Sequence, residues 1–360
     1  MCRYCYGKCV DDFLKEDEEK NYDLTLPPEI SYSIEQLQKF AAKDPELVIT
    51  FYGGEPLLKK DKIIEIMDNV PAKDFMIQTN GWFLDKLPFE YINRMSTILV
   101  SIDGTKKHTN FCRGKGVYEK VITNVKKLRE QGYTGHIIAR MTVDETSQVY
   151  DNVLHLIEQP KLFDGVHWQM DAQFFEADFK TRNYKEWTQV QYNPQITQLI
   201  EWWIEQITTT NKVPLIYPLT AVMNTLLTNE KVPLRCGAGH SVLGLQTNGI
   251  VAACPITAGF KPLYMGDLTN SPSELLQKTI VPDRQCTTCE IRNVCGGRCL
   301  YANKSQFWGK EGFSQVCDTV FHLVNELKRH LPIIEEKLKQ KQLTLESFAY
   351  TKYNGVEVIP

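Results

Sequence analysis

Residues 47–56 read LVITFYGGEP, a short apolar stretch that runs directly into a glycine-rich turn. Its first six residues are rich in β-branched and aromatic side chains and predict a strand. Helical spacing follows over Asp61–Val70, where Ile63, Ile64 and Met67 share one face. A strand followed by a helix is the repeating unit of an α/β fold, so this stretch indicates the fold class.

The same alternation extends on both sides of this stretch. Upstream, Ser33 and Gln36 predict a capping box that begins a helix. Downstream, the predicted strands are Phe75–Gln78, Thr97–Ile102, His136–Val143 and Val166–Phe174, and the predicted helices include Val117–Gln131 and Gln148–Glu158. Repeated strand–helix order implies parallel strands joined by right-handed crossovers.

Three of the predicted strands end in polar or glycine-rich segments. These segments are Gly53–Pro56, Thr79–Gly81 and Ser101–Gly104. In barrels and open α/β folds, the loops after the carboxyl ends of the strands build the active site. One such segment alone would be turn chemistry, but three in succession on one edge predict a functional site.

Composition excludes several classes of function. The chain has 360 residues, 24% of them charged, and a net charge of −3. It has no basic excess for nucleic acid, and no uninterrupted apolar run of about 18 residues for a membrane span. The N-terminal stretch MCRYCYGKCVDDF has no apolar signal core, so the expected compartment is the reducing cytoplasm. Clustered cysteines there indicate metal ligands or redox groups in preference to disulfides.

Seven cysteines crowd into the C-terminal part of the chain: Cys236, Cys254, Cys286, Cys289, Cys295, Cys299 and Cys317. The run that begins at Cys286 reads C-x2-C-x5-C-x3-C. So many closely spaced thiols are atypical of a packed core and predict metal binding. The residues alone leave open whether the metal is zinc, in a pair of zinc ribbons, or iron.

The N-terminal group Cys2-Arg3-Tyr4-Cys5 adds the feature that suggests a family. Together with the Gly53–Pro56 loop and the C-terminal cysteines, it resembles the radical SAM superfamily, in the branch that carries a SPASM domain. Cys2 and Cys5 match the last two cysteines of the C-x3-C-x2-C signature, and Tyr4 matches its aromatic residue. The first cysteine would lie four positions before Cys2, so we expect this chain to be an N-terminally shortened version. Cys9 is an alternative third ligand, although an unrelated loop thiol is the simpler interpretation.

The resemblance implies an α/β fold, a partial (β/α)6 TIM-like barrel that here lacks its first strand. We expect the barrel over residues 1–225, the small cysteine-rich iron–sulfur SPASM domain over 226–330, and a helical tail over 331–360. A helix over Asp318–His330 is predicted to stop near Pro332.

The resemblance also implies roles for individual residues. The loop with Gly53, Gly54 and Glu55 would meet the amino group of S-adenosylmethionine, and Arg113 suits its carboxylate. The full set of expected cofactor-binding residues is Tyr4, Gly53, Gly54, Glu55, Asn80, Ser101, Asp103, Arg113 and Arg140, of which Asn80 and Arg140 have the weakest basis.

Three [4Fe–4S] clusters are implied by the resemblance, one catalytic and two auxiliary. Cys2 and Cys5 would ligate the catalytic cluster, in which three thiolates normally leave one iron open. One auxiliary cluster would be held by Cys286, Cys289, Cys295 and Cys317, the other by Cys236, Cys254 and Cys299. No fourth ligand of the second is evident in the sequence.

The activity implied is the generation of a 5′-deoxyadenosyl radical, which abstracts a hydrogen atom from a peptide or protein substrate. The segment CRYCYGKCVDD resembles archaeal radical SAM proteins of the peptide-modifying kind. The resemblance also implies a ferredoxin or flavodoxin as the electron donor. Pro255 follows Cys254 where related sulfatase-maturing enzymes carry an aspartate, which counts against that activity. The alternatives are a non-catalytic iron–sulfur or zinc protein that binds a peptide, and a plain electron carrier.

Overall fold

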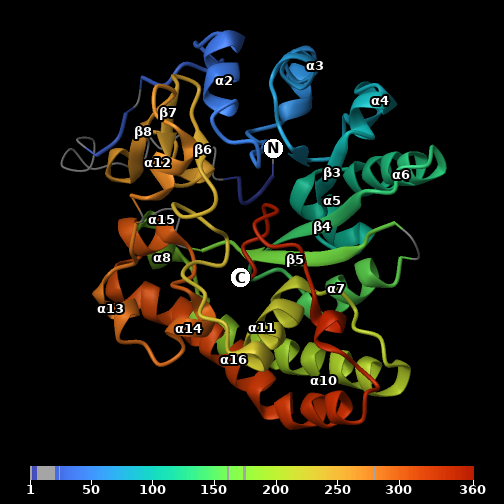
Figure 1. Cartoon of the computed structure of the whole chain (residues 1–360). Helices are drawn as coiled ribbons and strands as arrows, with labels where there is room; N and C mark the ends of the chain where they lie inside the picture. Colours follow the sequence, from blue (N-terminus) through green and yellow to red (C-terminus); the bar gives the residue numbers. More distant parts are fainter. Residues whose placement is uncertain (1, 6–20, 24, 160–161, 173–175, 279) are drawn as a thin grey trace.

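A parallel sheet of five strands forms the centre of the N-terminal half (Figure 1). The computed structural model describes residues 2–5, 21–23, 25–159, 162–172, 176–278 and 280–360. The strands follow one another across the sheet in chain order: β1 Val48–Phe51, β2 Asp74–Thr79, β3 Met95–Ser101, β4 His136–Val143 and β5 Gly165–Met170. A parallel sheet in sequential order is the arrangement of a (β/α) barrel, whereas a doubly wound sheet reverses its order. The chain is therefore an α/β protein of the partial-barrel type.

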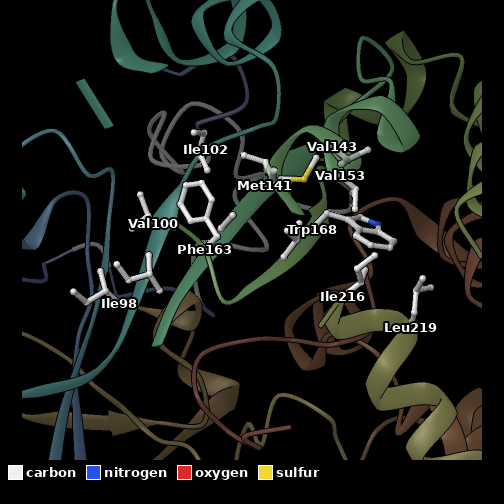
Figure 2. Packing of buried hydrophobic residues seen from close by; sticks show 14 of the residues in the cluster. Ile98, Val100, Ile102, Met141, Val143, Val153, Phe163, Trp168, Ile216 and Leu219 are labelled. Atoms are coloured by element: carbon white, nitrogen blue, oxygen red, sulfur yellow. The ribbon is translucent and has the colours of Figure 1, made fainter. Parts of the chain in front are cut away.

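Helices connect the strands and cover one face of the sheet. They are α2 Ile34–Ala41, α3 Lys60–Asn69, α4 Phe89–Ile92, α5 Lys106–Arg113, α6 Val117–Glu130 and α7 Val149–Ile157. The capping box predicted at Ser33 is confirmed, since its side chain accepts from the Gln36 backbone N–H and Gln36 reaches back. Figure 2 shows the packing between sheet and helices, where Val100, Met141 and Trp168 point toward the same side as Val153 of α7.

The opposite face of the sheet, which we call the inner face, is packed by the last described segment of the chain, residues 349–360. Met76, Leu99 and Ile138 of β2, β3 and β4 form a buried cluster with Val356 and Val358. In Figure 1 the C-terminal segment, drawn in red, lies beside β5. The inner face is therefore built partly by residues more than 200 positions from its strands.

The middle and C-terminal parts add a helical layer and a small cysteine-rich unit. The helices are α8 Glu176–Thr181, α9 Tyr184–Trp187, α10 Asn193–Thr210, α11 Tyr217–Thr228, α12 Pro272–Leu276, α13 Arg284–Thr287, α14 Arg292–Cys295, α15 Leu300–Ser305 and α16 Gly309–Lys339. An antiparallel sheet of β6 Gly244–Leu245, β7 Ile250–Ala252 and β8 Tyr264–Asp267 lies among the cysteines.

Helix α16 corrects one prediction. The helix expected to stop near Pro332 continues through that proline to Lys339 and has 31 residues. A proline in a helix interior costs about 3 kcal/mol because a hydrogen bond is lost and its ring clashes with the preceding turn. Burial of Leu327 and Ile334, both fully buried on either side of Pro332, offsets that cost.

Candidate cofactor and metal site

Glu55 joins two of the predicted site loops at the carboxyl edge of the sheet. Its Oε1 accepts hydrogen bonds from the Leu57 N–H at 3.0 Å and from Thr79 Oγ1 at 2.8 Å. Its Oε2 accepts from the Asn80 N–H at 2.7 Å. The carboxylate thus fixes the loop after β1 against the end of β2. Its direct contact with a cofactor amino group, expected from the sequence, remains a prediction.

Gly53 and Gly54 border open space. A Cβ added at either position would meet no atom within 4 Å, so packing against the protein does not require glycine there. Gly53 has φ +155°, a value that side-chain-bearing residues rarely adopt. The pair therefore leaves exposed backbone that another molecule can approach closely.

A buried ion pair lies at the end of β3. Arg113 donates from Nε to Asp103 Oδ2 at 2.7 Å and from Nη2 to Asp103 Oδ1 at 2.8 Å, and Asp103 is fully buried. Asp103 Oδ1 also accepts from the Thr142 N–H at 2.9 Å, which ties the pair to β4. Burial lowers the pKa of Arg113, but the charge and hydrogen bonding of Asp103, together with Tyr4 and Cys2, more than offset this effect. The pKa of Arg113 is therefore raised and the guanidinium stays charged.

Tyr4 connects this ion pair to the N-terminal cysteines. Its hydroxyl donates to Asp103 Oδ2, and the Arg113 guanidinium lies 5.5 Å from the centre of its ring. The adjacent Arg3 N–H donates to the Cys112 carbonyl at 3.0 Å. Cys2 and Cys5 are consequently held beside α5 at the carboxyl edge of the sheet, while Cys9 lies outside the described residues.

Some of the expected cofactor residues contact one another, whereas others make separate local contacts. Tyr4, Asp103 and Arg113 form one contact network at the edge, and Ser101 ends β3 beside it. Asp103 occupies two of the nitrogens of Arg113, so the predicted contact of this guanidinium with a cofactor carboxylate stays a prediction. Asn80 uses its Oδ1 to accept from the Trp82 N–H at 2.8 Å, a local turn bond.

Arg140 lies on the inner face of β4, in register with Ser101 of β3. Its Nη2 donates to Glu357 Oε1 at 2.5 Å, and Glu357 Oε2 lies 3.8 Å from Nε2 of the fully buried His167. Arg140 and His167 are paired in register on β4 and β5, so they point to the same face. Sequence reasoning missed Glu357 and His167, because only the fold brings position 357 to position 140.

Four of the cysteines surround one cavity. Cys286, Cys289, Cys295 and Cys317 all line a cavity of about 320 Å³, together with Arg298 and Phe313. Cys286 lies on the short helix α13, Cys295 on the short helix α14, and Cys289 between the two helices. Cys317 reaches the same cavity from the long helix α16. These are the same four thiols that the sequence groups as ligands of one cluster.

The remaining three cysteines lie close together in a second group. Burial raises the pKa of Cys254 well above its ordinary value, and the charges of Cys236 and Cys299 raise it further. Burial likewise raises the pKa of Cys236 to about 12, with contributions from Cys299 and Glu357. All ten described cysteines are free thiols. Within the described ranges, no three His, Cys, Asp or Glu side chains converge as ligands of a single metal ion.

These buried thiols predict an alkaline loss of stability in the metal-free protein. Burial raises the pKa of Cys317 from 9.0 to about 12, and that of Cys236 similarly. Below pH 9 the folded and unfolded states both hold the protons, but between pH 9 and 12 only the folded state keeps them. The urea midpoint should therefore be constant up to about pH 9 and fall above it. A Cys236→Ser, Cys317→Ser variant should fall less steeply, and an identical slope would contradict this explanation.

Thiols grouped in this way, with a thiol loop fixed over the carboxyl edge of a parallel sheet, are the arrangement expected of a metal- and cofactor-binding α/β protein. Residues 1–152 match the family model of the radical SAM superfamily, and the chain carries a radical SAM domain. Members of that superfamily bind AdoMet and a 4Fe–4S cluster.

Two curated relatives extend over most of the chain. The radical SAM cyclopropyl synthase TigE of Paramaledivibacter caminithermalis is 20% identical over 85% of this chain. An uncharacterized protein of Archaeoglobus fulgidus is 25% identical over 87% of it. The chain spans 66% of the length of TigE, slightly less than two thirds, and 75% of the length of the second relative.

Solved structures show the same fold over both halves of the chain. Native anSMEcpe with bound AdoMet superposes with a TM-score of 0.68 at 15% identity, covering 94% of this chain and 95% of that one. Streptococcus suis SuiB bound to precursor peptide SuiA gives 0.52 at 12% identity, covering 83% and 68%. The partial barrel with a C-terminal extension is therefore confirmed. Among the helices that the structure describes, none is both long and apolar enough to cross a membrane.

Proposed function

We propose that this protein is a radical SAM enzyme that modifies a peptide or protein. The observation that carries the proposal is the Tyr4–Asp103–Arg113 network, which fixes Cys2 and Cys5 at the edge where Gly53 and Gly54 leave open space. A thiol loop and an approachable glycine backbone on one edge are what an iron–sulfur cluster with a bound sulfonium nucleotide requires. Two of the similar folds, anSMEcpe with the Kp18Cys peptide and SuiB with SuiA, hold peptides, which supports the substrate class.

The residues present fit the cofactors at the edge. Cys2 and Cys5 would hold the catalytic cluster, and the backbone of Gly53 and Gly54 would accept from the AdoMet amino group. Glu55 orients that loop, because its carboxylate binds three donors of the protein. When bound, the cluster and AdoMet together supply the radical that removes a hydrogen atom from the substrate.

The two cysteine groups fit auxiliary clusters. Thiolates are the usual ligands of iron–sulfur clusters, and a cavity of about 320 Å³ between four of them has room for one. Cys236, Cys254 and Cys299 would hold the other. Arg298, between Cys295 and Cys299 in sequence, is buried and places a positive charge beside both groups, which favours thiolate over thiol.

The proposal is tested by anaerobic turnover. Iron-loaded protein, given dithionite and AdoMet, should produce 5′-deoxyadenosine and methionine in equal amounts, detected by mass spectrometry. Cys5→Ala should reduce the yield by 100-fold or more, on the order of what removal of an essential group costs. Cys112→Ala is the matched control, because the hydrogen bond that joins Cys112 to the same loop comes from its backbone carbonyl, which the substitution keeps. This variant should keep the activity. Protein that binds iron at these cysteines and yields no 5′-deoxyadenosine would overturn the proposal, as would protein that holds only zinc.

A further inference from the structure

The inner face carries buried polar groups that the proposed chemistry at the edge does not use. Arg140 and Glu357 form an ion pair there, with Glu357 held in place by the packing of Val356 and Val358 against β2, β3 and β4. The second carboxylate oxygen of Glu357, Oε2, is buried and has no hydrogen-bond partner among the residues that the structure describes. A carboxylate oxygen is an acceptor only, so it requires a donor.

The two ring nitrogens of His167 are also buried polar atoms that make no hydrogen bond to the described residues. His167 is fully buried, and within the described part of the chain neither Nδ1 nor Nε2 has a hydrogen-bond partner. Burial lowers its pKa well below the ordinary 6.5, and the charge of Arg140 lowers it further, so the ring is neutral. A neutral imidazole offers one N–H donor and one acceptor. The 3.8 Å to Glu357 Oε2 is too long for a hydrogen bond between the two.

Gln169 lies two positions beyond His167 on β5, and alternation along a strand turns both side chains to the inner face. Its Oε1 is also buried without a partner. These buried atoms are acceptors on Glu357, Gln169 and one nitrogen of His167, and a donor on the other nitrogen of His167. The buried Nε of Arg140 adds a second donor at the same place, so the acceptors still outnumber the donors. Buried polar atoms in folded proteins are almost always satisfied, so this set marks a place where another group binds.

The charge of the site limits which chemical class of ligand it can bind. Arg140 and Glu357 cancel, and His167 is neutral, so the site has no net charge to attract an ion. A carboxylate would bring acceptors to a site that already has an excess of them, and an ammonium group would meet the guanidinium of Arg140. A carboxamide carries two N–H donors and one carbonyl acceptor, and is neutral.

We propose that Glu357, His167 and Gln169 form a binding site for a carboxamide group of the substrate, such as an asparagine or glutamine side chain. The two N–H groups of the carboxamide donate to Glu357 Oε2 and Gln169 Oε1, and its carbonyl accepts from His167. The assignment to a substrate rests on the proposed function, since Arg140 shares β4 with Thr142, which is bonded to Asp103 at the cofactor edge. Glu357 and Gln169 are then specificity-determining residues.

The test uses two probes that differ only in the group recognised, trifluoroacetamide and trifluoroacetate. Their binding to the full-length protein is measured by 19F NMR line broadening. The wild type should prefer the amide by about tenfold, the ratio expected for one hydrogen bond to a charged acceptor. Glu357→Gln removes the negative charge beside the Arg140 guanidinium, so the preference should reverse toward trifluoroacetate. Glu346→Gln, at an exposed position just before the C-terminal segment, is the matched control and should leave the preference unchanged.

A second variant keeps the test informative if Glu357→Gln does not fold. Gln169→Leu deletes one acceptor and leaves the Arg140–Glu357 pair intact, so it should weaken trifluoroacetamide binding without any gain for trifluoroacetate. Equal binding of the two probes by the wild type, or an unchanged preference in both variants, would overturn the proposal. Because the readout needs no turnover, its failure is separate from a failure to produce 5′-deoxyadenosine.

Discussion

Replacing Asp103 by alanine should lower the free energy of unfolding by about 3–5 kcal/mol, the cost of leaving one partner of a buried ion pair alone. Asp103 is fully buried and satisfies Arg113 twice, the Thr142 N–H and the Tyr4 hydroxyl. Without Asp103, the buried guanidinium of Arg113 loses its carboxylate partner, and the Cys2–Cys5 loop is no longer held at the sheet edge. Urea unfolding of wild type and variant measures the difference.

The double variant Asp103→Leu, Arg113→Met tests whether the instability comes from the unpaired charge or from the changed packing at this position. Because both charges are gone, it should recover most of the stability lost by the single variant. Glu35→Ala, which breaks an exposed pair with Lys39, is the control and should have no measurable effect. If the single and double variants were equally unstable, the ion pair would not be the cause. AdoMet binding should stay impaired in both, since Tyr4 has lost its acceptor.

The second large effect concerns the four-cysteine cavity. Iron loading should raise the midpoint of thermal unfolding, because a ligand that binds only the folded state stabilises it by about 4 kcal/mol at a thousandfold excess over its Kd. A Cys286→Ser, Cys317→Ser variant should lose the iron of this cavity and the corresponding part of the gain in Tm. Both thiols line the cavity, and they come from α13 and α16.

The comparison is made between loaded and metal-free forms of each protein. The metal-free variant should unfold within a few degrees of the metal-free wild type, since serine is close to cysteine in size. Cys112→Ser, at a buried thiol away from the cavity, should keep the full iron content. Equal iron in wild type and double variant would show that these thiols hold no cluster.

The sequence predicted the barrel well because its strands carry local signals. The strand predicted over Leu47–Tyr52 is β1, and the polar segments after β1, β2 and β3 do lie at one edge, as expected of parallel strands. Patterns of this kind depend on neighbours a few positions apart, which a single sequence displays. The grouping of Cys286, Cys289, Cys295 and Cys317 was predicted through the resemblance and is the set that lines one cavity.

What the sequence could not provide are the pairings between distant positions. Nothing local indicates that Asp103 takes Arg113 as its partner and Tyr4 as a third member, or that Glu55 binds Thr79 instead of standing free. Pro332 signalled a helix end by propensity, but tertiary burial on both sides outweighed it. The contact of Arg140 with Glu357 also has no local signal, and its expected role in cofactor binding stays a prediction.

The contact between Arg140 and Glu357 joins residues 217 positions apart, and this has a consequence for biosynthesis. During translation, all five strands leave the ribosome long before Val356, Glu357 and Val358 do. Until then the nascent sheet exposes Leu99 and Ile138 and leaves the Arg140 guanidinium without its carboxylate. Quality-control factors that recognise exposed apolar surface should therefore engage the growing chain until residues 349–360 have emerged. Closure of the inner face is then a late step, well after the five strands have been made.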